Sequence, residues 1–247
     1  MLVELRDVPG ALADLSLLLG KSKINILGGF ICAAKTQGEK DDNVSYRQMG
    51  LFVETEDREM TASNLESMVK SCPFTYRVKV KGSNDGLIVD SLSFPLRLSQ
   101  GQRAILMRKD VIAASMREVR QVFSSGGDVI LYKQGYAAGK SDAEELIRIF
   151  GQDNLLEKLE ELVNLYSSLG WGRARIVGVD FESLSAKIRV DQSFECLSQR
   201  SSKPFSQFLR GHLAGLTSGV LSTEMKCEET SCVSLGNSYC EFVLSVV

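Results

Sequence analysis

Apolar positions in the first 81 residues switch repeatedly between the spacing of strands and the spacing of helices. Alternating apolar residues indicate strands with one buried face, and apolar residues three and four apart indicate helices. The strands are expected at residues 2–5, 24–34, 49–54 and 74–80, and the helices at 11–19 and 60–69. A polar hairpin loop is expected over 35–44. This βαββαβ order predicts an α+β, ferredoxin-like domain.

A short segment rich in small and polar residues, Gly82 to Gly86, separates this domain from the rest. We predict three parts: a domain over 1–81, a linker with leading strands over 82–99, and a second domain over 100–247. Beyond the linker, helices are expected at 111–123, 135–150 and 155–169, and strands at 129–132, 175–179 and 186–190. The end of the chain reads as a helix running into a cysteine-rich strand or hairpin. These elements predict an α/β domain.

Two Gly-x-x-x-Gly stretches lie in this second domain, at 135–139 and 211–215. Glycines four apart share one helix face, so another helix or a strand can approach closely. Neither stretch is a phosphate-binding loop, since GxxxxGK[ST] does not occur in the sequence. We expect both helices to pack on one sheet.

Composition and charge change this picture little. The 29 basic and 31 acidic residues nearly balance, so no general attraction to nucleic acid or membranes is implied. No apolar run is long enough to span a membrane, and the N-terminus does not resemble a signal peptide. Six cysteines in 247 residues do not form a disulfide scaffold. We therefore expect a cytoplasmic protein whose thiols are reduced or bound to metal.

The first domain resembles the ACT domain family through Asp7-Val-Pro-Gly-Ala-Leu-Ala13 and, a dozen residues later, Ile24-Asn-Ile26. ACT domains pair side by side and bind an amino acid or similar effector between them. The resemblance implies a homodimer with effector contacts at Asp7, Gly10 and Asn25. A turn glycine and a helix N-terminus also suit a carboxylate. Dimerisation without an effector is the alternative, because fold does not fix function.

The chain from about residue 86 onward resembles the 4-vinyl-reductase (4VR) family. The specific signal is Glu229-x-x-Cys232-x-x-x-Gly236-x-x-x-Cys240-x-Phe242, supported by the glycine pairs and Gly170-Trp-Gly172. Members of that family bind small hydrophobic ligands, often with a structural zinc ion nearby. The resemblance therefore implies a ligand-binding domain.

The family's zinc site can be carried over residue by residue. Glu229, Cys232 and Cys240 match three ligands, whereas the first ligand, a cysteine, falls at or near Ser206. Thiolates and carboxylates suit four-coordinate zinc. Cys227 or Cys196 could supply the fourth ligand, and we assign the site to Glu229, Cys232, Cys240 and Cys227. The alternatives are buried free cysteines, or a Cys232–Cys240 disulfide in an oxidising setting.

Aromatic residues suggest where a hydrophobic ligand would bind. His212 is the only histidine, and it lies within the second glycine-paired helix. The expected pocket is lined by Trp171, Phe194, Phe205, Phe208 and His212. The same residues could equally be ordinary core.

Two binding modules in one chain predict a ligand-sensing regulatory protein that is not an enzyme. No nucleotide cofactor is expected, since no GxGxxG follows a predicted strand. No DNA-reading helix pair or basic stripe is visible, so the output would pass through a protein partner or regulated dimerisation. The alternatives are a reductase, which the family name suggests, and a non-catalytic assembly subunit.

Overall fold

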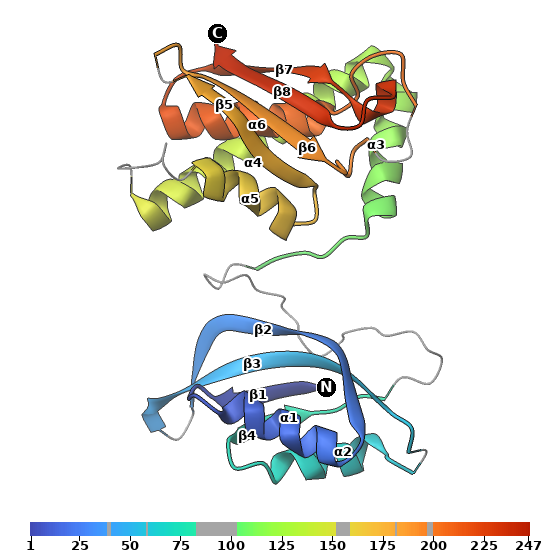
Figure 1. Ribbon diagram of the computed structural model, residues 1–247, viewed down its shortest axis with the longest axis vertical. Helices are drawn as coiled ribbons and strands as arrows, with labels where there is room; N and C mark the ends of the chain where they lie inside the picture. Colours follow the sequence, from blue (N-terminus) through green and yellow to red (C-terminus); the bar gives the residue numbers. More distant parts are fainter. Residues whose placement is uncertain (39–40, 58, 83–102, 152–158, 181, 197–199) are drawn as a thin grey trace. The chain divides into compact units, whose positions relative to one another are not determined.

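The chain divides into two units, Met1–Leu106 and Met107–Val247, in the computed structural model of Figure 1. The structure describes residues 1–38, 41–57, 59–82, 103–151, 159–180, 182–196 and 200–247. Nearly all of the expected linker, and the alternating stretch within it, lie outside these residues. Each unit has its own sheet and hydrophobic core, and each is described by itself.

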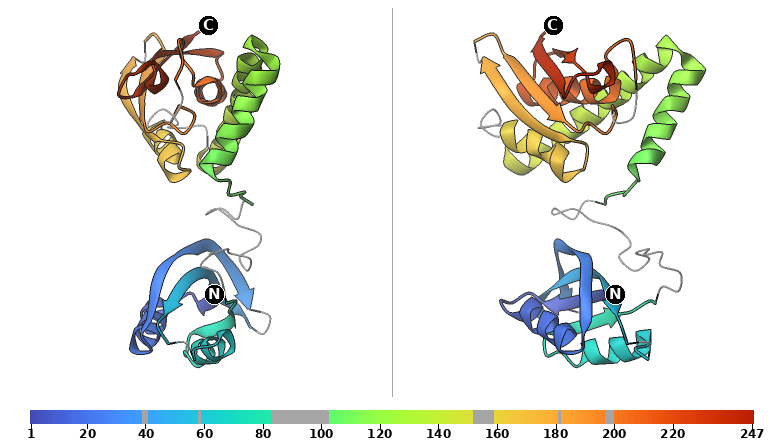
Figure 2. Two further views of the ribbon diagram at one scale, coloured as in Figure 1. Left: turned by 90° about the vertical axis from the view of Figure 1, so that its right-hand side faces the viewer. Right: turned by 45° about the vertical axis from the view of Figure 1, so that its right-hand side comes forward.

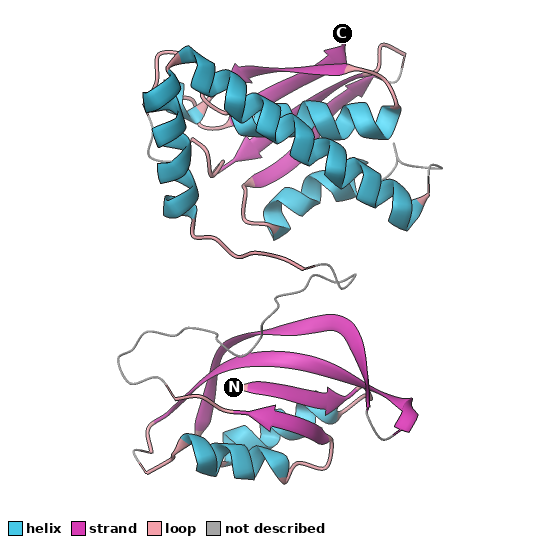
Figure 3. Ribbon diagram, turned by 180° about the vertical axis from the view of Figure 1, so that it is seen from behind, coloured by secondary structure: helices cyan, strands magenta, loops and turns pink. Residues whose placement is uncertain are grey.

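The first unit is an antiparallel four-stranded sheet with two helices on one face (Figures 1 and 3). Its elements are β1 (Leu2–Arg6), α1 (Ala11–Lys21), β2 (Ile24–Gly38), β3 (Asp41–Thr55), α2 (Ala62–Lys70) and β4 (Thr75–Lys79). The element order is the expected βαββαβ, and the strand order is β2-β3-β1-β4. Apolar side chains from the sheet and both helices, including Val3, Leu15 and Val69, are fully buried between them.

The β2–β3 ribbon is longer than expected. The loop predicted over 35–44 is wrong, since β2 runs to Gly38 and β3 begins at Asp41. Lys35 pairs with Arg47 and Thr36 pairs with Tyr46 in this extension. Main-chain hydrogen bonds can continue a ribbon without an apolar face, and that face was the only sequence signal used for the strand.

The second unit is an antiparallel sheet of order β5-β6-β8-β7, with helices layered on one side (Figures 1 and 3). Its helices are α3 (Lys109–Phe123), α4 (Ser125–Phe150), α5 (Leu159–Ser168), α6 (Gln207–Leu221) and the short η1 (Val233–Leu235). Its strands are β5 (Arg173–Asp180), β6 (Ser185–Asp191), β7 (Met225–Ser231) and β8 (Cys240–Val246). Helix α6 is buried along most of its length between the sheet and α4.

The strand predicted at 129–132 is wrong, because these residues belong to α4. A short apolar run fits a buried strand and a buried helix equally well. The preceding glycines misled as well, since they lie in the first turn of α4. A Cβ on Gly127 would collide with the backbone of Val119 and Arg120, so glycine permits the tight corner between α3 and α4.

The two Gly-x-x-x-Gly stretches face each other across α4 and α6. A Cβ on Gly135 or Gly139 would overlap the carbonyl oxygen of Phe208 or His212. Reciprocally, a Cβ on Gly211 or Gly215 would overlap a carbonyl oxygen of α4. The glycines therefore bring the two helix backbones into direct contact. The expected close approach is confirmed, although α4 reaches the sheet through α6 and does not lie on it.

Within the described residues, no helix combines the length and apolarity that crossing a membrane requires.

Candidate functional site

Three thiols and one carboxylate converge at the N-terminal end of α6. Cys196 comes from the loop after β6, Glu229 from β7, Cys232 from the turn after β7 and Cys240 from the start of β8. One potential ligand atom from each lies within 4.8 Å of the others, and all four residues are buried. Two sulfurs bound to one tetrahedral zinc ion at about 2.3 Å lie about 3.8 Å apart. The 3.5 Å between the Sγ atoms of Cys196 and Cys232 is close to that spacing.

Ser206 lies against this cluster and joins it to α6. Its hydroxyl donates to Glu229 Oε1 at 2.7 Å and lies 2.8 Å from Cys196 Sγ. Its backbone N–H donates to Glu229 Oε2 at 2.9 Å. Ser206 is the N-cap of α6, so Glu229 accepts a hydrogen bond from the N-terminus of the helix that it packs against. The residue at the expected fourth-ligand position thus supports the cluster from outside.

The protonation of the cluster reflects burial and crowding. Burial raises the pKa of Glu229 to about 8. Hydrogen bonding with Cys232 raises the pKa of Cys196 to about 12, and the same contact lowers the pKa of Cys232. The geometry thus favours one thiolate that accepts hydrogen bonds from its neighbours. A divalent cation would replace the remaining protons, as expected when thiols become metal ligands.

Cys227 does not join the other three predicted ligands, and Cys196 lies in the place assigned to it. Cys227 is a buried residue of β7, and burial raises its pKa. It shares a face with Glu229 but lies one strand repeat, about 6.6 Å, farther along. Cys196 reaches the cluster because the loop after β6 returns to the start of β8, where Val190 pairs with Cys240. Cys232 and Cys240 are free thiols, so the disulfide alternative is not what the structure contains.

A second buried carboxylate, Glu195, holds the same end of α6, and no sequence pattern pointed to it. Its two oxygens accept the backbone N–H groups of Phe208 and Leu209 at 3.1 and 3.0 Å. Arg120 of α3 donates to Glu195 at 2.7 Å, and its guanidinium lies 3.9 Å from the centre of the Phe205 ring. Complete burial raises the pKa of Glu195, while Arg120 and the helix N–H groups oppose this. The ion pair therefore ties α3 to the start of α6.

Four of the five predicted pocket residues form one aromatic cluster. Ring centroids of Trp171 lie 5.8 Å from Phe194, 5.7 Å from Phe208 and 4.9 Å from His212. Phe205 instead packs beneath Arg120. Side chains thus contact one another where an open pocket was expected, so these residues act as core here.

His212 bridges two helices within this cluster. Its Nδ1 lies 2.6 Å from the Tyr166 hydroxyl of α5, and its Nε2 lies 2.9 Å from Asp142 Oδ2 of α4. Burial raises the pKa of Tyr166 well above its usual value, so its phenol stays protonated. Neither partner was predicted, because partners from separate helices leave no mark in local spacing.

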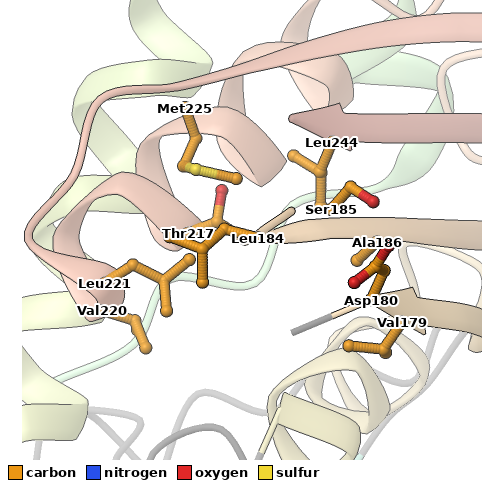
Figure 4. Close-up of a pocket in the computed structure, with 10 residues that line it drawn as sticks. All are labelled: Val179, Asp180, Leu184, Ser185, Ala186, Thr217, Val220, Leu221, Met225 and Leu244. Atoms are coloured by element: carbon orange, nitrogen blue, oxygen red, sulfur yellow. The ribbon is translucent and has the colours of Figure 1, made fainter. Parts of the chain in front are cut away.

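A small cavity of about 30 Å³ lies at the opposite, C-terminal end of α6 (Figure 4). Its walls come from α6, the β5–β6 hairpin, β7 and β8. None of the predicted pocket residues lines it. Its lining residues are Val179, Asp180, Leu184, Ser185, Ala186, Thr217, Val220, Leu221, Met225 and Leu244.

The predicted effector residues of the first unit do not come together within one chain. Asp7 follows β1 beside Ser45 and pairs with Arg47, whose Nε lies 2.7 Å from Asp7 Oδ1. Asn25 pairs with Glu54 at the other end of β3. Nine residues of strand separate Ser45 from Glu54, or about 30 Å if fully extended. Gly10 precedes α1 with a φ of 93°, so its turn favours glycine.

Comparison with protein families bears on the second unit. Residues 186–246 match the vinyl-4-reductase (V-4-R) domain. The matched region contains β6, α6, β7 and β8, together with all four residues of the thiol–carboxylate cluster. The 4-vinyl-reductase resemblance is thus confirmed at the level of this domain, over a shorter stretch than expected. The match does not extend into the first unit.

One relative shares part of the chain at higher identity. An uncharacterized protein of Methanocaldococcus jannaschii, MJ1642, is 32% identical over 111 residues, which are 43% of this chain and 66% of that protein. The chain thus spans just under two thirds of that relative.

Two solved structures are also similar. The phenol-responsive sensory domain of the transcription activator PoxR, solved with phenol, has a TM-score of 0.55 at 20% identity and covers 61% of this chain and 83% of that one. A vinyl-4-reductase family protein from M. jannaschii has a TM-score of 0.37 at 19% identity and covers 59% and 99% of the two chains. At this level of identity the likeness to PoxR concerns the fold.

Proposed function

We propose that this chain is a regulatory protein that senses a small hydrophobic molecule through its second unit. The observation that carries this proposal is the contrast between the two ends of α6. One end is held by the thiol–carboxylate cluster and Glu195, and the other faces a cavity walled by apolar side chains. Preformed apolar cavities with few polar groups are the usual form of small-molecule sites. The sensory role of the PoxR domain, which shares this fold, supports the proposal.

We infer that the cluster holds a structural zinc ion through Cys196, Glu229, Cys232 and Cys240. Four ligands from four separate segments would close the coordination sphere, as in structural rather than catalytic sites. The ion would fix the loop after β6, the N-terminus of α6 and the β7–β8 turn relative to one another. No reaction is assigned to it, and this chain is proposed to be non-enzymatic.

We infer that the first unit is an ACT-like, ferredoxin-like domain that pairs with a second copy. Asp7 and Asn25 lie at opposite ends of β3, so a site using both would form between two chains. An amino-acid-like effector there would favour one arrangement of the dimer. Each ligand can shift that equilibrium only by its difference in affinity for the two arrangements. The output would pass to a protein partner in the cytoplasm, without direct contact to nucleic acid or membrane.

The experiment is a thermal-unfolding screen of the full chain against small hydrophobic molecules (alkyl alcohols, alkyl amines and phenols) and against amino acids. A ligand at a hundred times its Kd should stabilise the folded state by about 2.7 kcal/mol. We expect at least one hydrophobic class to raise the Tm of the second unit, which the fluorescence of Trp171 reports. If no class raises it at saturating concentrations, the sensing proposal is wrong.

A further inference from the structure

The cavity at the C-terminal end of α6 offers apolar surface and no free hydrogen-bonding group. Thr217 is the polar residue of α6 that lines it, and its hydroxyl already donates to Leu213 O at 2.7 Å. The Ser185 hydroxyl lies 2.9 Å from that of Ser183. A polar ligand group would lose its hydration here without gaining a partner, which is unfavourable. The occupant must therefore be a hydrocarbon group.

The size of the cavity limits that group further. An engineered cavity of about 150 Å³ accommodates a benzene ring. A cavity of about 30 Å³ is too small for an aromatic ring, but it can take the last few carbons of an alkyl chain. The rest of such a ligand must lie outside, at the mouth. The aromatic cluster around Trp171 is filled by its own side chains, so it does not compete as a preformed site.

The mouth carries a negative charge at the tip of the β5–β6 hairpin. Asp180 lines the cavity and is exposed, next to Val179, which is 40% exposed (Figure 4). Its Oδ1 accepts the backbone N–H groups of Glu182 and Ser183 at 2.9 and 3.1 Å, which fixes the carboxylate. These hydrogen bonds, led by that from Ser183, lower the pKa of Asp180, so it is ionised at neutral pH. Among the described residues, no Lys or Arg pairs with it.

The hairpin is also strained where it lines the cavity. Leu184 has a φ of 48°, in the left-handed region that non-glycine residues seldom occupy. Glycine would relieve this strain at a turn. A leucine there instead supplies an apolar wall between the mouth and Met225 (Figure 4).

We propose that this cavity binds the end of a short alkyl chain whose positively charged ammonium head lies outside, against Asp180. The inference rests on the proposed sensing function and specifies its ligand as a small alkylammonium compound. Such a ligand would join the β5–β6 hairpin to the C-terminal end of α6.

The test uses the full chain with three probes of equal length: n-butylammonium, n-butanol and butyrate. Binding is followed by NMR of the methyl groups of Leu184, Val220 and Leu244 during titration. We expect these methyl signals to shift with butylammonium, less with butanol and least with butyrate. Asp180→Asn should weaken butylammonium binding about threefold, the size of an exposed charge interaction, and leave butanol unchanged. Asp191→Asn, which makes the same charge change on the same sheet, is the matched control and should have no effect.

Filling the cavity gives a second, independent readout. Ala186→Leu places a larger side chain into it and should weaken all three probes at least tenfold. If that variant does not fold, the Asp180→Asn comparison still decides, because Asp180 is exposed. Shifts confined to residues around Trp171 would overturn this site and leave the sensing function standing. Tighter binding of butyrate than of butylammonium would overturn the ammonium assignment. If neither these probes nor any hydrophobic class of the thermal screen binds, both proposals fail.

Discussion

Replacing Gly139 by alanine tests whether the backbone contact between α4 and α6 is as close as the structure shows. The new Cβ would overlap the carbonyl oxygen of His212 and lie 2.6 Å from the amide nitrogen of Leu216. Both are backbone atoms of a buried helix and cannot rotate away. Overpacking of this kind costs about 1–3 kcal/mol, whereas alanine gains about 1 kcal/mol over glycine within a helix. We expect a net loss of about 1–2 kcal/mol in the free energy of unfolding.

The matched control is Gly126→Ala in the same helix. Its Cβ would meet nothing closer than Phe123 Cβ at 3.8 Å, so the ordinary preference for alanine should make it neutral or stabilise it by up to about 1 kcal/mol. Urea denaturation followed by Trp171 fluorescence measures both variants in the second unit. The opposite signs are the prediction. A Gly139→Ala protein as stable as Gly126→Ala would refute the close contact.

The double variant with Gly215→Ala sharpens this test. Gly215 faces Tyr136 O across the same interface, so the separation that admits the first Cβ also makes room for the second. The two losses should therefore sum to more than the loss of the double variant, as for neighbouring residues that share one backbone shift. Strictly additive losses would mean that the two glycines act independently.

Two further predictions concern the polar groups that hold α6. Arg120→Met should cost about 3–5 kcal/mol by leaving Glu195 buried without its partner, and equilibrium urea unfolding would show it; a loss below 1 kcal/mol would mean that the pair is not buried. Tyr166 has a raised pKa in the folded state, so its contribution to stability is complete below pH 10 and is lost as the pH rises above 10. Tyr166→Phe should therefore lose about 1 kcal/mol at pH 7 by removing the bond to His212 and should show a shallower decline in Tm above pH 10 than the wild type; an equally steep decline would contradict this assignment.

The sequence predicts the first unit well because its strands and helices are locally amphipathic. Each element there buries one face against the others, and that face is visible as spacing. The second unit is harder to predict where elements are buried on several sides. Helix α6 is enclosed nearly all round, and the start of α4 carries a run of apolar residues that also fits a strand. Burial on all sides removes the periodicity that distinguishes the two.

The candidate site shows the same limit at the level of single residues. Glu229, Cys232 and Cys240 are found together because they lie close in sequence, on two paired strands and the turn between them. Cys196 comes from the far side of α6, and only the fold brings it near. The choice of Cys227 followed from its closeness in sequence to Glu229, which the geometry of a strand does not convert into closeness of ligand atoms.

The zinc content of protein purified without added metal tests most directly whether α6 is anchored as proposed. Elemental analysis of the wild type, Cys196→Ser and Cys227→Ser should give about one zinc per chain for the wild type and for Cys227→Ser, because Cys227 lies outside the cluster of four ligands. Cys196→Ser should lose most of its zinc. Retention of zinc by Cys196→Ser together with its loss from Cys227→Ser, or metal-free wild-type protein that takes up no zinc on titration, would contradict the account.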